Sequence, residues 1–342
     1  MNRYAFKIFL VLFSIIFYTS CNKTIDKATS HCPCFERELP SGFVQIDPAD
    51  DKNFVGIENI SIENYPKVDG STSANILNTM IACKMLGVHY GWITLVTEWF
   101  LVPYYMGDYS YNVIFNERIK TSQTHGAFMN LINGDAEIIL THRTISPDEK
   151  AHADELGVSL IETSIALDAF IFVVNKENPV KSLTINDIQK IYTKEITNWS
   201  QVEGKNEIIK VFTRPRNSGS EEVFRELVMD GLEPADFPEA AIGAMAWVFA
   251  EVYNNENAIC YSFNTYKDLQ ARMPCNEVPV IAINDICPSE STIKNGTYPF
   301  ISKVHVAIRS DLDRNSMAYK LYEWLQSEDA KSTIIECGFI PK

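Results

Sequence analysis

Short apolar runs rich in β-branched and aromatic residues alternate along this chain with longer segments of helical period. The runs predict β-strands at 112–115, 136–140, 169–174, 208–212, 258–261 and 304–308. Segments whose apolar residues recur every three or four positions predict helices at 73–87, 127–133, 184–192, 220–230 and 316–336. This rhythm indicates an α/β architecture with layered sheets.

Residues 88–111 depart from this rhythm, because eight Trp, Tyr and Phe residues crowd into 24 positions. The simple interpretation is a large aromatic helix or loop packed on the core. The alternative is a patch that docks a partner.

The first twenty residues predict a secretory signal rather than part of the fold. Arg3 and Lys7 precede an apolar run over 8–18, which is shorter than the roughly 20 residues of a membrane-spanning helix. The run ends in Thr19-Ser20-Cys21, which resembles a lipobox, although Tyr18 stands where Leu is usual. We therefore expect residues 1–20 to be a lipoprotein signal, Cys21 to carry lipid and residues 21–43 to be a polar linker at the outer face of a membrane. Plain cleavage and an uncleaved anchor are the alternatives.

Length and charge narrow the classes of function. At roughly 100–200 residues per domain, 342 residues suggest two domains. The formal charge is −14 and no Lys/Arg-rich run occurs, which argues against a nucleic-acid partner. Loss of Arg3 and Lys7 with the signal would make the chain still more acidic.

The eight cysteines raise the question of disulfides in a secreted chain. Cys83 and Cys337 lie in apolar surroundings and are expected to be small buried residues. Cys275 and Cys287 flank a strand-like run and are the best guess for a bridge. His31-Cys32-Pro33-Cys34 resembles half of a zinc site, but without a matching second pair it is more simply a linker feature.

Hydroxyl-rich loops that open helices carry the candidate chemistry. Residues 69–73 precede the helix at 73–87, residues 217–220 precede the helix at 220–230, and residues 124–126 precede the helix at 127–133. Free backbone N–H groups and hydroxyls at helix N-termini bind tetrahedral oxyanions. Plain N-capping is the alternative for any single loop. Arg214 and Arg143 favour the anion interpretation, since a guanidinium matches phosphate geometry.

Five stretches together resemble the phosphate-binding substrate proteins of bacterial ABC importers. They are residues 134–143, 167–180, 191–199, 214–220 and 338–341, in that family's order and within a likeness spanning about 65–342. The resemblance implies a two-lobed α/β periplasmic-binding-protein (type II) fold, with lobe I at 44–167 plus 271–342, lobe II at 168–270 and a cleft between lobes that close by a hinge. It also implies an ABC permease as partner, phosphate or a related oxyanion as ligand, no cofactor or metal, and a monomer.

Carried over motif by motif, the resemblance places the ligand contacts on two sides of the cleft. They are Ser71, Thr72, Ser73, Thr124, Thr141, His142 and Arg143 on one side, and Arg214, Ser218, Gly219 and Ser220 on the other.

His142 departs from the family, which has Ser or Asp there. A carboxylate at this position would accept the proton of monohydrogen phosphate and so reject sulfate. A neutral imidazole also accepts, an imidazolium does not, and Asp69 is a second candidate acceptor. A solvated or capping role is the alternative for His142. Glu221 and Glu222 would repel an anion if they pointed into the cleft.

Two classes of function follow. The first is a lipoprotein that captures phosphate for a permease without covalent chemistry. The alternative is a surface lipoprotein on the same scaffold that acts in protein interaction or sensing without transport. An enzyme is not expected, because the sequence has no Gly-x-Ser-x-Gly elbow, metal-spaced His cluster or Walker loop.

Overall fold

The computed structural model describes residues 30–33, 45–95, 98–103, 115–237, 245–269 and 277–342. Its main feature is a seven-stranded mixed sheet in the order β1-β4-β10-β5-β8-β7, with β11 pairing with β5. The bounds are β1 Val68–Gly70, β4 Ile138–Thr141, β5 Leu160–Val174, β7 Lys210–Val211, β8 Ala258–Phe263, β10 Ile301–Arg309 and β11 Ile340–Pro341. The expected strands at 136–140, 169–174, 208–212, 258–261 and 304–308 are thus confirmed, with shifted ends. Of the strand expected at 112–115, residues 112–114 lie outside the described residues and Phe115 begins a helical turn.

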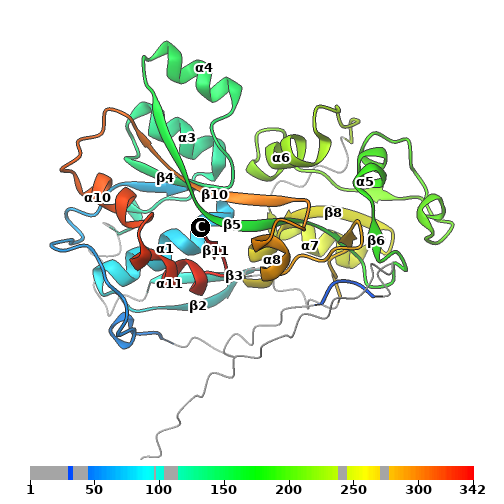
Figure 1. Ribbon diagram of the computed structural model, residues 1–342, viewed down its shortest axis with the longest axis horizontal. Coiled ribbons are helices and arrows are strands. Elements are labelled where there is room, and N and C mark those ends of the chain that lie inside the picture. The colour runs from blue at the N-terminus through cyan, green and yellow to red at the C-terminus, as the bar shows by residue number, and fades with distance from the viewer. Residues whose placement is uncertain (1–29, 34–44, 96–97, 104–114, 238–244, 270–276) are drawn as a thin grey trace, which may run out of the picture.

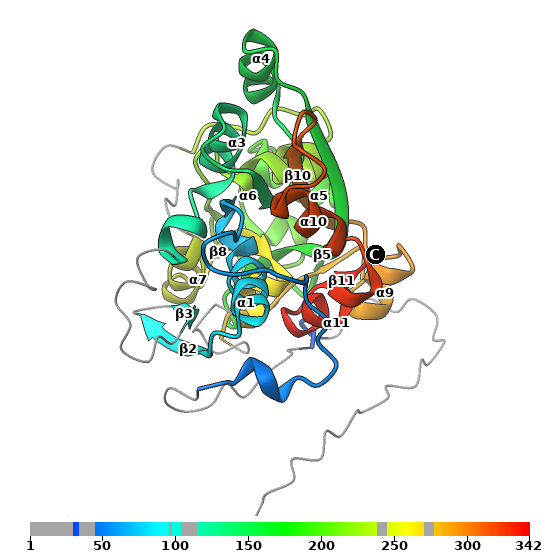
Figure 2. The ribbon, with the colours of Figure 1, turned by 90° about the vertical axis from the view of Figure 1, so that its left-hand side faces the viewer.

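Helices cover both faces of this sheet. They are α1 Asn75–Leu86, α3 Gln123–Asn133, α4 Pro147–Glu155, α5 Ile185–Tyr192, α6 Gly219–Val223, α7 Met245–Asn254, α8 Asn264–Leu269, α9 Glu290–Lys294, α10 Met317–Trp324 and α11 Glu328–Glu336. A π-helix, Phe224–Met229, continues α6. Figure 1 shows α3 and α4 above the sheet and α1 and α11 below it, and Figure 2 shows the same two layers from the side.

Two long strands join the two ends of the molecule. The 15-residue β5 pairs antiparallel with β10 along its first part and with β8 along its last part. The pairing of β5 with β10 shifts register between Val304 and His305. In Figure 1 both strands run across the middle of the molecule, so each end is tied to the other by continuous sheet.

The buried apolar side chains form two main cores, one at each end. The first core contains α1, β4, α10 and α11 residues such as Leu77, Leu140 and Ile334. The second core contains the last part of β5, β8, α5 and α7, including Phe172 and Tyr261. Several apolar residues between positions 278 and 300 are also buried in this second core. The pairing of β9 (Ala282–Ile283) with β6 (Ser182–Leu183) holds this segment there.

Local sequence explains where several helices begin and end. Gly87 has the left-handed φ of 64° and its N–H bonds the last carbonyls of α1, which stops the helix there. The single helix expected at 316–336 is two helices, because Ser327 turns extended (φ −87°, ψ 168°) to become the N-cap of α11. Its hydroxyl donates to Trp324 O at the end of α10.

The aromatic segment is a β-hairpin where it is described, so the expectation of a helix or loop was wrong there. β2 (Tyr90–Leu95) pairs antiparallel with β3 (Glu98–Pro103), and Tyr90 and Leu101 are buried in the first core. Alternating strand geometry places Trp92 on the same face as these two residues, and it packs against the first core. The rest of the segment, 104–111, lies outside the described residues.

The N-terminal segment is tied to the second core by a disulfide. Cys32 is bonded to Cys287, and Cys32 N donates to Val280 O. The expected bridge between Cys275 and Cys287 was therefore wrong, since spacing along the chain does not report which cysteine approaches from elsewhere. Cys83 and Cys337 are buried, as expected, and burial raises the pKa of the Cys83 thiol. Residues 21–29 and 34–43 of the expected linker lie outside the described residues.

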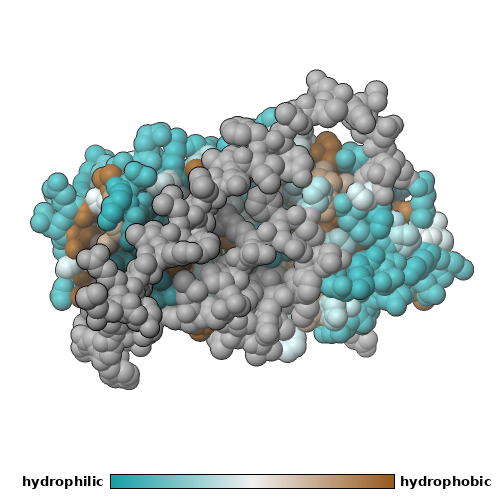
Figure 3. Space-filling view, turned by 90° about the horizontal axis from the view of Figure 1, so that it is seen from below, coloured by the Kyte–Doolittle hydropathy of each residue, from teal (hydrophilic) through white to brown (hydrophobic). Residues whose placement is uncertain are grey.

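Figure 3 shows the molecule from below, relative to Figure 1, with hydrophilic residues on the surface at the end that holds α5 and β6. None of the helices in the described part of the chain combines the length and the hydropathy needed to span a membrane.

Candidate functional site

The first loop of the site lies where β1 ends and α1 begins. β1 and β4 are parallel neighbours, with Gly70 opposite Leu140, so Ser71 lies beside the end of β4 and its N–H donates to Leu140 O at 3.0 Å. The 3-10 turn η2 (Thr72–Ala74) then leads into α1. Ser71 and Ser73 are buried and Thr72 is half-buried. Two neighbouring strand ends therefore bring Ser71, Thr72, Ser73 and Thr141 together.

His142 follows β4 and lies in the interior of the molecule. Its ring is 4.2 Å from that of Phe263 and 5.6 Å from that of Phe339, and the residue is 3% exposed. Its Nδ1 lies 2.8 Å from Ser73 Oγ, and its Nε2 lies 3.5 Å from Asp168 Oδ2 on β5. The solvated or capping alternative for His142 is thus wrong.

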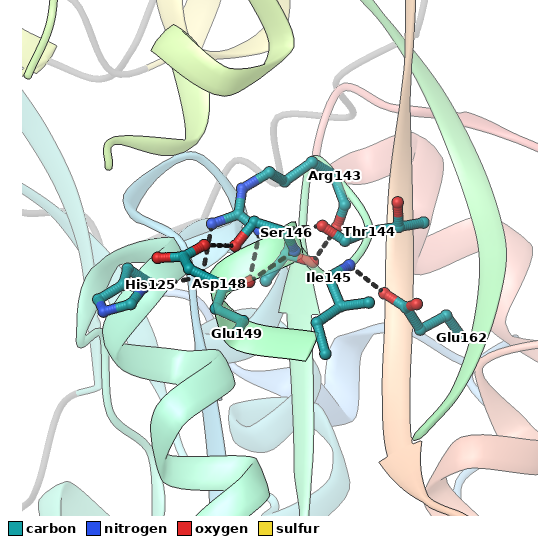
Figure 4. Close-up of polar contacts among 9 residues, drawn as sticks. His125, Arg143, Thr144, Ile145, Ser146, Asp148, Glu149 and Glu162 are labelled. Carbon is teal, nitrogen blue, oxygen red and sulfur yellow. Dashed lines mark hydrogen bonds and ion pairs between the residues drawn. The ribbon is translucent and has the colours of Figure 1, made fainter. Parts of the chain in front are cut away.

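Arg143 is held by Glu149 of α4 in a buried two-pronged ion pair. Both of its terminal nitrogens donate to the Glu149 carboxylate at 2.7 Å, and the side chains are 4% and 0% exposed. The same carboxylate accepts from Ser146 N and bonds His125 Nδ1 at 2.9 Å (Figure 4). Arg143 Nε has no hydrogen-bond partner among the described residues. These bonds fix the orientation of the guanidinium and leave its Nε–H without a partner among the described residues.

Thr124, near the start of α3, meets Gly219, at the start of α6. A Cβ built on Gly219 would lie 2.2 Å from Thr124 Oγ1 and 3.1 Å from Thr124 Cβ. Only a glycine permits this approach, so helix starts that are 95 positions apart along the chain come together across the two ends of the molecule.

Asp69 holds the loop that precedes α3 in place. Its Oδ1 accepts from Gly70 N and Ser122 N, and its Oδ2 accepts from Asn130 Nδ2. Both oxygens are thus engaged by groups around α3. The carboxylate therefore ties the end of β1 to the start of α3.

Arg214 lies beside the loop that opens α6. Its Nε donates to Ser220 Oγ at 3.3 Å, and its backbone N–H donates to Tyr261 OH. Ser218 is the N-cap of α6 and accepts from Glu221 N. Arg214, Ser218, Gly219 and Ser220 are therefore neighbours, as expected.

The two acids of α6 have different surroundings. Glu221 turns back into the second core, where Arg225 and Tyr261 bind its two oxygens. Burial, with the nearby carboxylates of Asp148 and Glu149, raises the pKa of Glu222, while Arg143 and Arg225 oppose this. Glu221 is thus removed as a source of repulsion, and Glu222 lies in an environment that disfavours its charge.

Sequence reasoning missed Glu149 and Asp168. Ser146 and Glu149 form a capping box, and Ser-Pro-Asp-Glu at 146–149 carries that signature. Asp168 gave no such signal, because it lies within an apolar strand. Among the described residues, no group of three or more His, Cys, Asp or Glu is arranged to hold a metal ion.

Comparison with known proteins gives the family context of this geometry. The profile of a PBP superfamily domain matches residues 94–329. The phosphate-binding protein PstS of Bacillus subtilis (strain 168) is 25% identical over 185 residues, which cover 54% of this chain and 58% of that protein. Protein SphX of Synechococcus elongatus is 26% identical over 239 residues, which cover 67% of this chain and 70% of that protein. The chain thus matches less than two thirds of the length of the Bacillus relative.

Solved structures show the same fold. A Clostridium perfringens protein with bound phosphate superposes with a TM-score of 0.58 at 21% identity, covering 83% of this chain and 99% of that one. An ABC-type phosphate transport receptor from Vibrio cholerae gives 0.56 at 23% identity, with coverage of 82% and 99%. The expected two-lobed α/β fold is confirmed by these matches.

Proposed function

Because this chain belongs to the PBP superfamily, we propose that it is an extracytoplasmic solute-binding protein that captures phosphate, or a related oxyanion, for an ABC importer. Similarity to a phosphate-binding protein and to an ABC-type phosphate transport receptor supports both the proposed ligand and the proposed transport role. The observation that carries the proposal is the contact of Gly219 with Thr124, which brings hydroxyl-bearing helix starts from both ends of the molecule together.

The proposed ligand contacts are of three kinds. Hydroxyls come from Ser71, Thr72, Ser73, Thr124 and Thr141, and from Ser218 and Ser220 on the other side. Backbone N–H groups at the starts of the helices, including that of Gly219, add partial positive charge. Arg214 supplies a full positive charge. Arg143, whose orientation is fixed by Glu149, adds to the positive electrostatic potential. His142 acts behind Ser73 rather than in contact with the anion.

The proposed lobes follow the two cores. Lobe I takes residues 44–167 together with the C-terminal part of the chain, and lobe II takes 168–270. Since residues of 278–300 pack in the second core, we assign them to lobe II as well. β5 and β10 then form the hinge, because both run from one core to the other.

The role proposed is noncovalent capture and delivery. The chain acts as a monomer tethered through lipid on Cys21 after loss of residues 1–20, and hands the anion to a membrane permease. No catalytic step and no cofactor are part of this proposal.

Calorimetry of purified residues 22–342 tests the function with phosphate, sulfate and molybdate. A phosphate dissociation constant of about 1 μM or lower is expected, equivalent to about −8 kcal/mol. Arg214→Ala should abolish the signal. Lys210→Ala is the matched control, because Lys210 is an exposed cation that bonds the Asn255 side chain, outside the site. Absence of heat with all three oxyanions would refute the proposal, and an unchanged affinity in Arg214→Ala would refute that contact.

A further inference from the structure

Tyr261 is a fully buried residue of β8 that lies beside the loop opening α6. Its ring stacks on that of Phe224, with centroids 4.6 Å apart and an interplanar angle of 5°, and it lies 5.4 Å from the ring of Phe170. Because protein interiors are close-packed, these rings hold the tyrosine side chain in one orientation. Its hydroxyl is therefore a fixed point in the second core.

The Tyr261 hydroxyl bonds both ends of this loop. Its oxygen accepts from the backbone N–H of Arg214 at 3.0 Å, and it donates its proton to the carboxylate of Glu221. Arg214 and Glu221 are seven positions apart, and the proposed ligand contacts at 218–220 lie between them. One buried hydroxyl thus ties together the residues on either side of these contacts.

The direction of each bond follows from the donors present. A backbone N–H only donates, so the Tyr261 oxygen accepts from Arg214. The one proton of Tyr261 then goes to Glu221 Oε2, while Glu221 Oε1 accepts from Arg225 Nε at 2.8 Å. Burial, together with the charge of Glu221, raises the pKa of Tyr261 well above its ordinary value, so the hydroxyl keeps this proton. A hydrogen bond to an ionised carboxylate is stronger than a neutral one, and Glu221 therefore holds the hydroxyl firmly.

The hydrogen bonds inside the loop are weaker than this tie. Ser218 Oγ accepts from Glu221 N at 3.3 Å, and Ser220 Oγ accepts from Arg214 Nε at 3.3 Å. Both distances exceed the usual upper limit of about 3.2 Å for a bond of this kind. The shape of the loop therefore depends on its attachment to Tyr261.

We propose that Tyr261 is a positioning residue of the anion site, whose hydroxyl holds Arg214 and Glu221 so that the loop between them has its binding shape before the anion arrives. The inference rests on the proposed function of the same site. A preorganised loop raises affinity, because binding then orders fewer groups. Simple electrostatics predicts the opposite role for Glu221, since loss of a carboxylate one residue after Ser220 would strengthen the binding of an anion.

Tyr261→Phe removes the hydroxyl and keeps the ring. Phosphate binding measured by calorimetry should become about tenfold weaker, as expected for the loss of one buried hydrogen bond that involves a charged group. Tyr298→Phe is the matched control, because Tyr298 is also fully buried in the second core and its hydroxyl donates to Phe170 O at 2.9 Å. Both variants should lower the melting temperature, but Tyr298→Phe should keep the wild-type affinity. Equal affinity losses in the two variants, or none in Tyr261→Phe, would overturn the inference.

Two substitutions of Glu221 separate the hydrogen bond from the charge. Glu221→Ala removes the acceptor and should weaken phosphate binding about tenfold, like Tyr261→Phe. Glu221→Gln removes the charge but keeps a carbonyl oxygen that can accept from Tyr261, while Arg225 retains its ion pair with Glu233. It should recover most of the loss. Tighter binding in both variants would show that Glu221 acts through its charge and would contradict the positioning role.

Hydrogen exchange of the Arg214 amide, followed by NMR without any ligand, reads the tie directly. The amide should exchange slowly in wild type and in Tyr298→Phe, and much faster in Tyr261→Phe. An Arg214 amide that exchanges equally fast in wild type and Tyr261→Phe would overturn the inference while phosphate binding itself persists. Absence of oxyanion binding in wild type would instead overturn the proposed function, and the exchange rates would still decide whether Tyr261 holds the loop.

Discussion

Gly219→Ala tests whether the two lobes must meet at Thr124 to hold the anion. The new Cβ would lie 2.2 Å from Thr124 Oγ1, where ordinary contact begins at 3.4 Å, so the two segments must separate by more than 1 Å. Thr124 is buried and β-branched, and its Cβ is itself 3.1 Å away, so a change of its rotamer does not remove the overlap.

This overlap destabilises the closed state, in which Gly219 and Thr124 meet. Overpacking a close contact costs about 1–3 kcal/mol, which corresponds to phosphate binding that is between about 5-fold and 150-fold weaker. Gly219 has no left-handed φ, and alanine is the better helix former, so the open state is not destabilised. The melting temperature without phosphate should therefore stay the same or rise slightly while the affinity falls.

Calorimetry and thermal melts of the same preparations separate the two effects. Gly56→Ala is the matched control, since its Cβ would meet the flexible side chains of Phe54 and Met85 at 3.1 Å and 3.2 Å, away from the site. It should leave phosphate affinity at the wild-type value. Wild-type affinity in Gly219→Ala would show that binding does not need this contact, and would refute the reasoning.

Three further predictions concern stability. Glu149→Gln removes one partner of the buried pair with Arg143 and should lower the free energy of unfolding in urea by about 3–5 kcal/mol. The control Asp154→Asn breaks the exposed pair with Lys150 and should lower the free energy of unfolding by less than about 1 kcal/mol. Equal losses in the two variants would contradict this prediction. Cys32→Ser should destabilise the protein by about 2–5 kcal/mol, and adding Cys287→Ser should cost little more, so two additive losses in the melting temperature would argue against the bridge. Burial, with a smaller effect of His142, lowers the pKa of His305 from 6.5 to about 4. The folded state therefore binds this proton less readily than the unfolded chain, and the free energy of unfolding should fall as the pH drops from about 6.5 to 4. Urea titrations across that range should show a shallower fall in His305→Gln, and an identical slope would refute the assignment.

Much of the site could be predicted because its signals are local. A glycine or serine before an amphipathic helix reports a helix start, and the loops at 69–73 and 217–220 lie where their sequences place them. The strand at 136–140 likewise delivers Thr141, His142 and Arg143 to the end of β4. These features depend on residues within a turn or two of each other.

The errors arose where the decisive partner is distant along the chain. Cys287 is bonded to Cys32, 255 positions away, rather than to the nearer Cys275. The pairing of β2 with β3 was missed because bulky aromatic residues fit a helix, a loop or a strand, and packing of β3 against α1 decided between them.

The sequence by itself determined the alternation of strands and helices and the helix starts that carry hydroxyls. It also carried the motifs that resemble the phosphate-binding proteins of ABC importers. Those properties follow from periodicity and from capping, which act over a few residues. Only the tertiary structure decided that Gly219 meets Thr124, that Asp69 is occupied, and that His142 lies between Ser73 and Asp168. Burial decides which polar atoms must find partners, and it is fixed only when the strands of one sheet bring distant segments together.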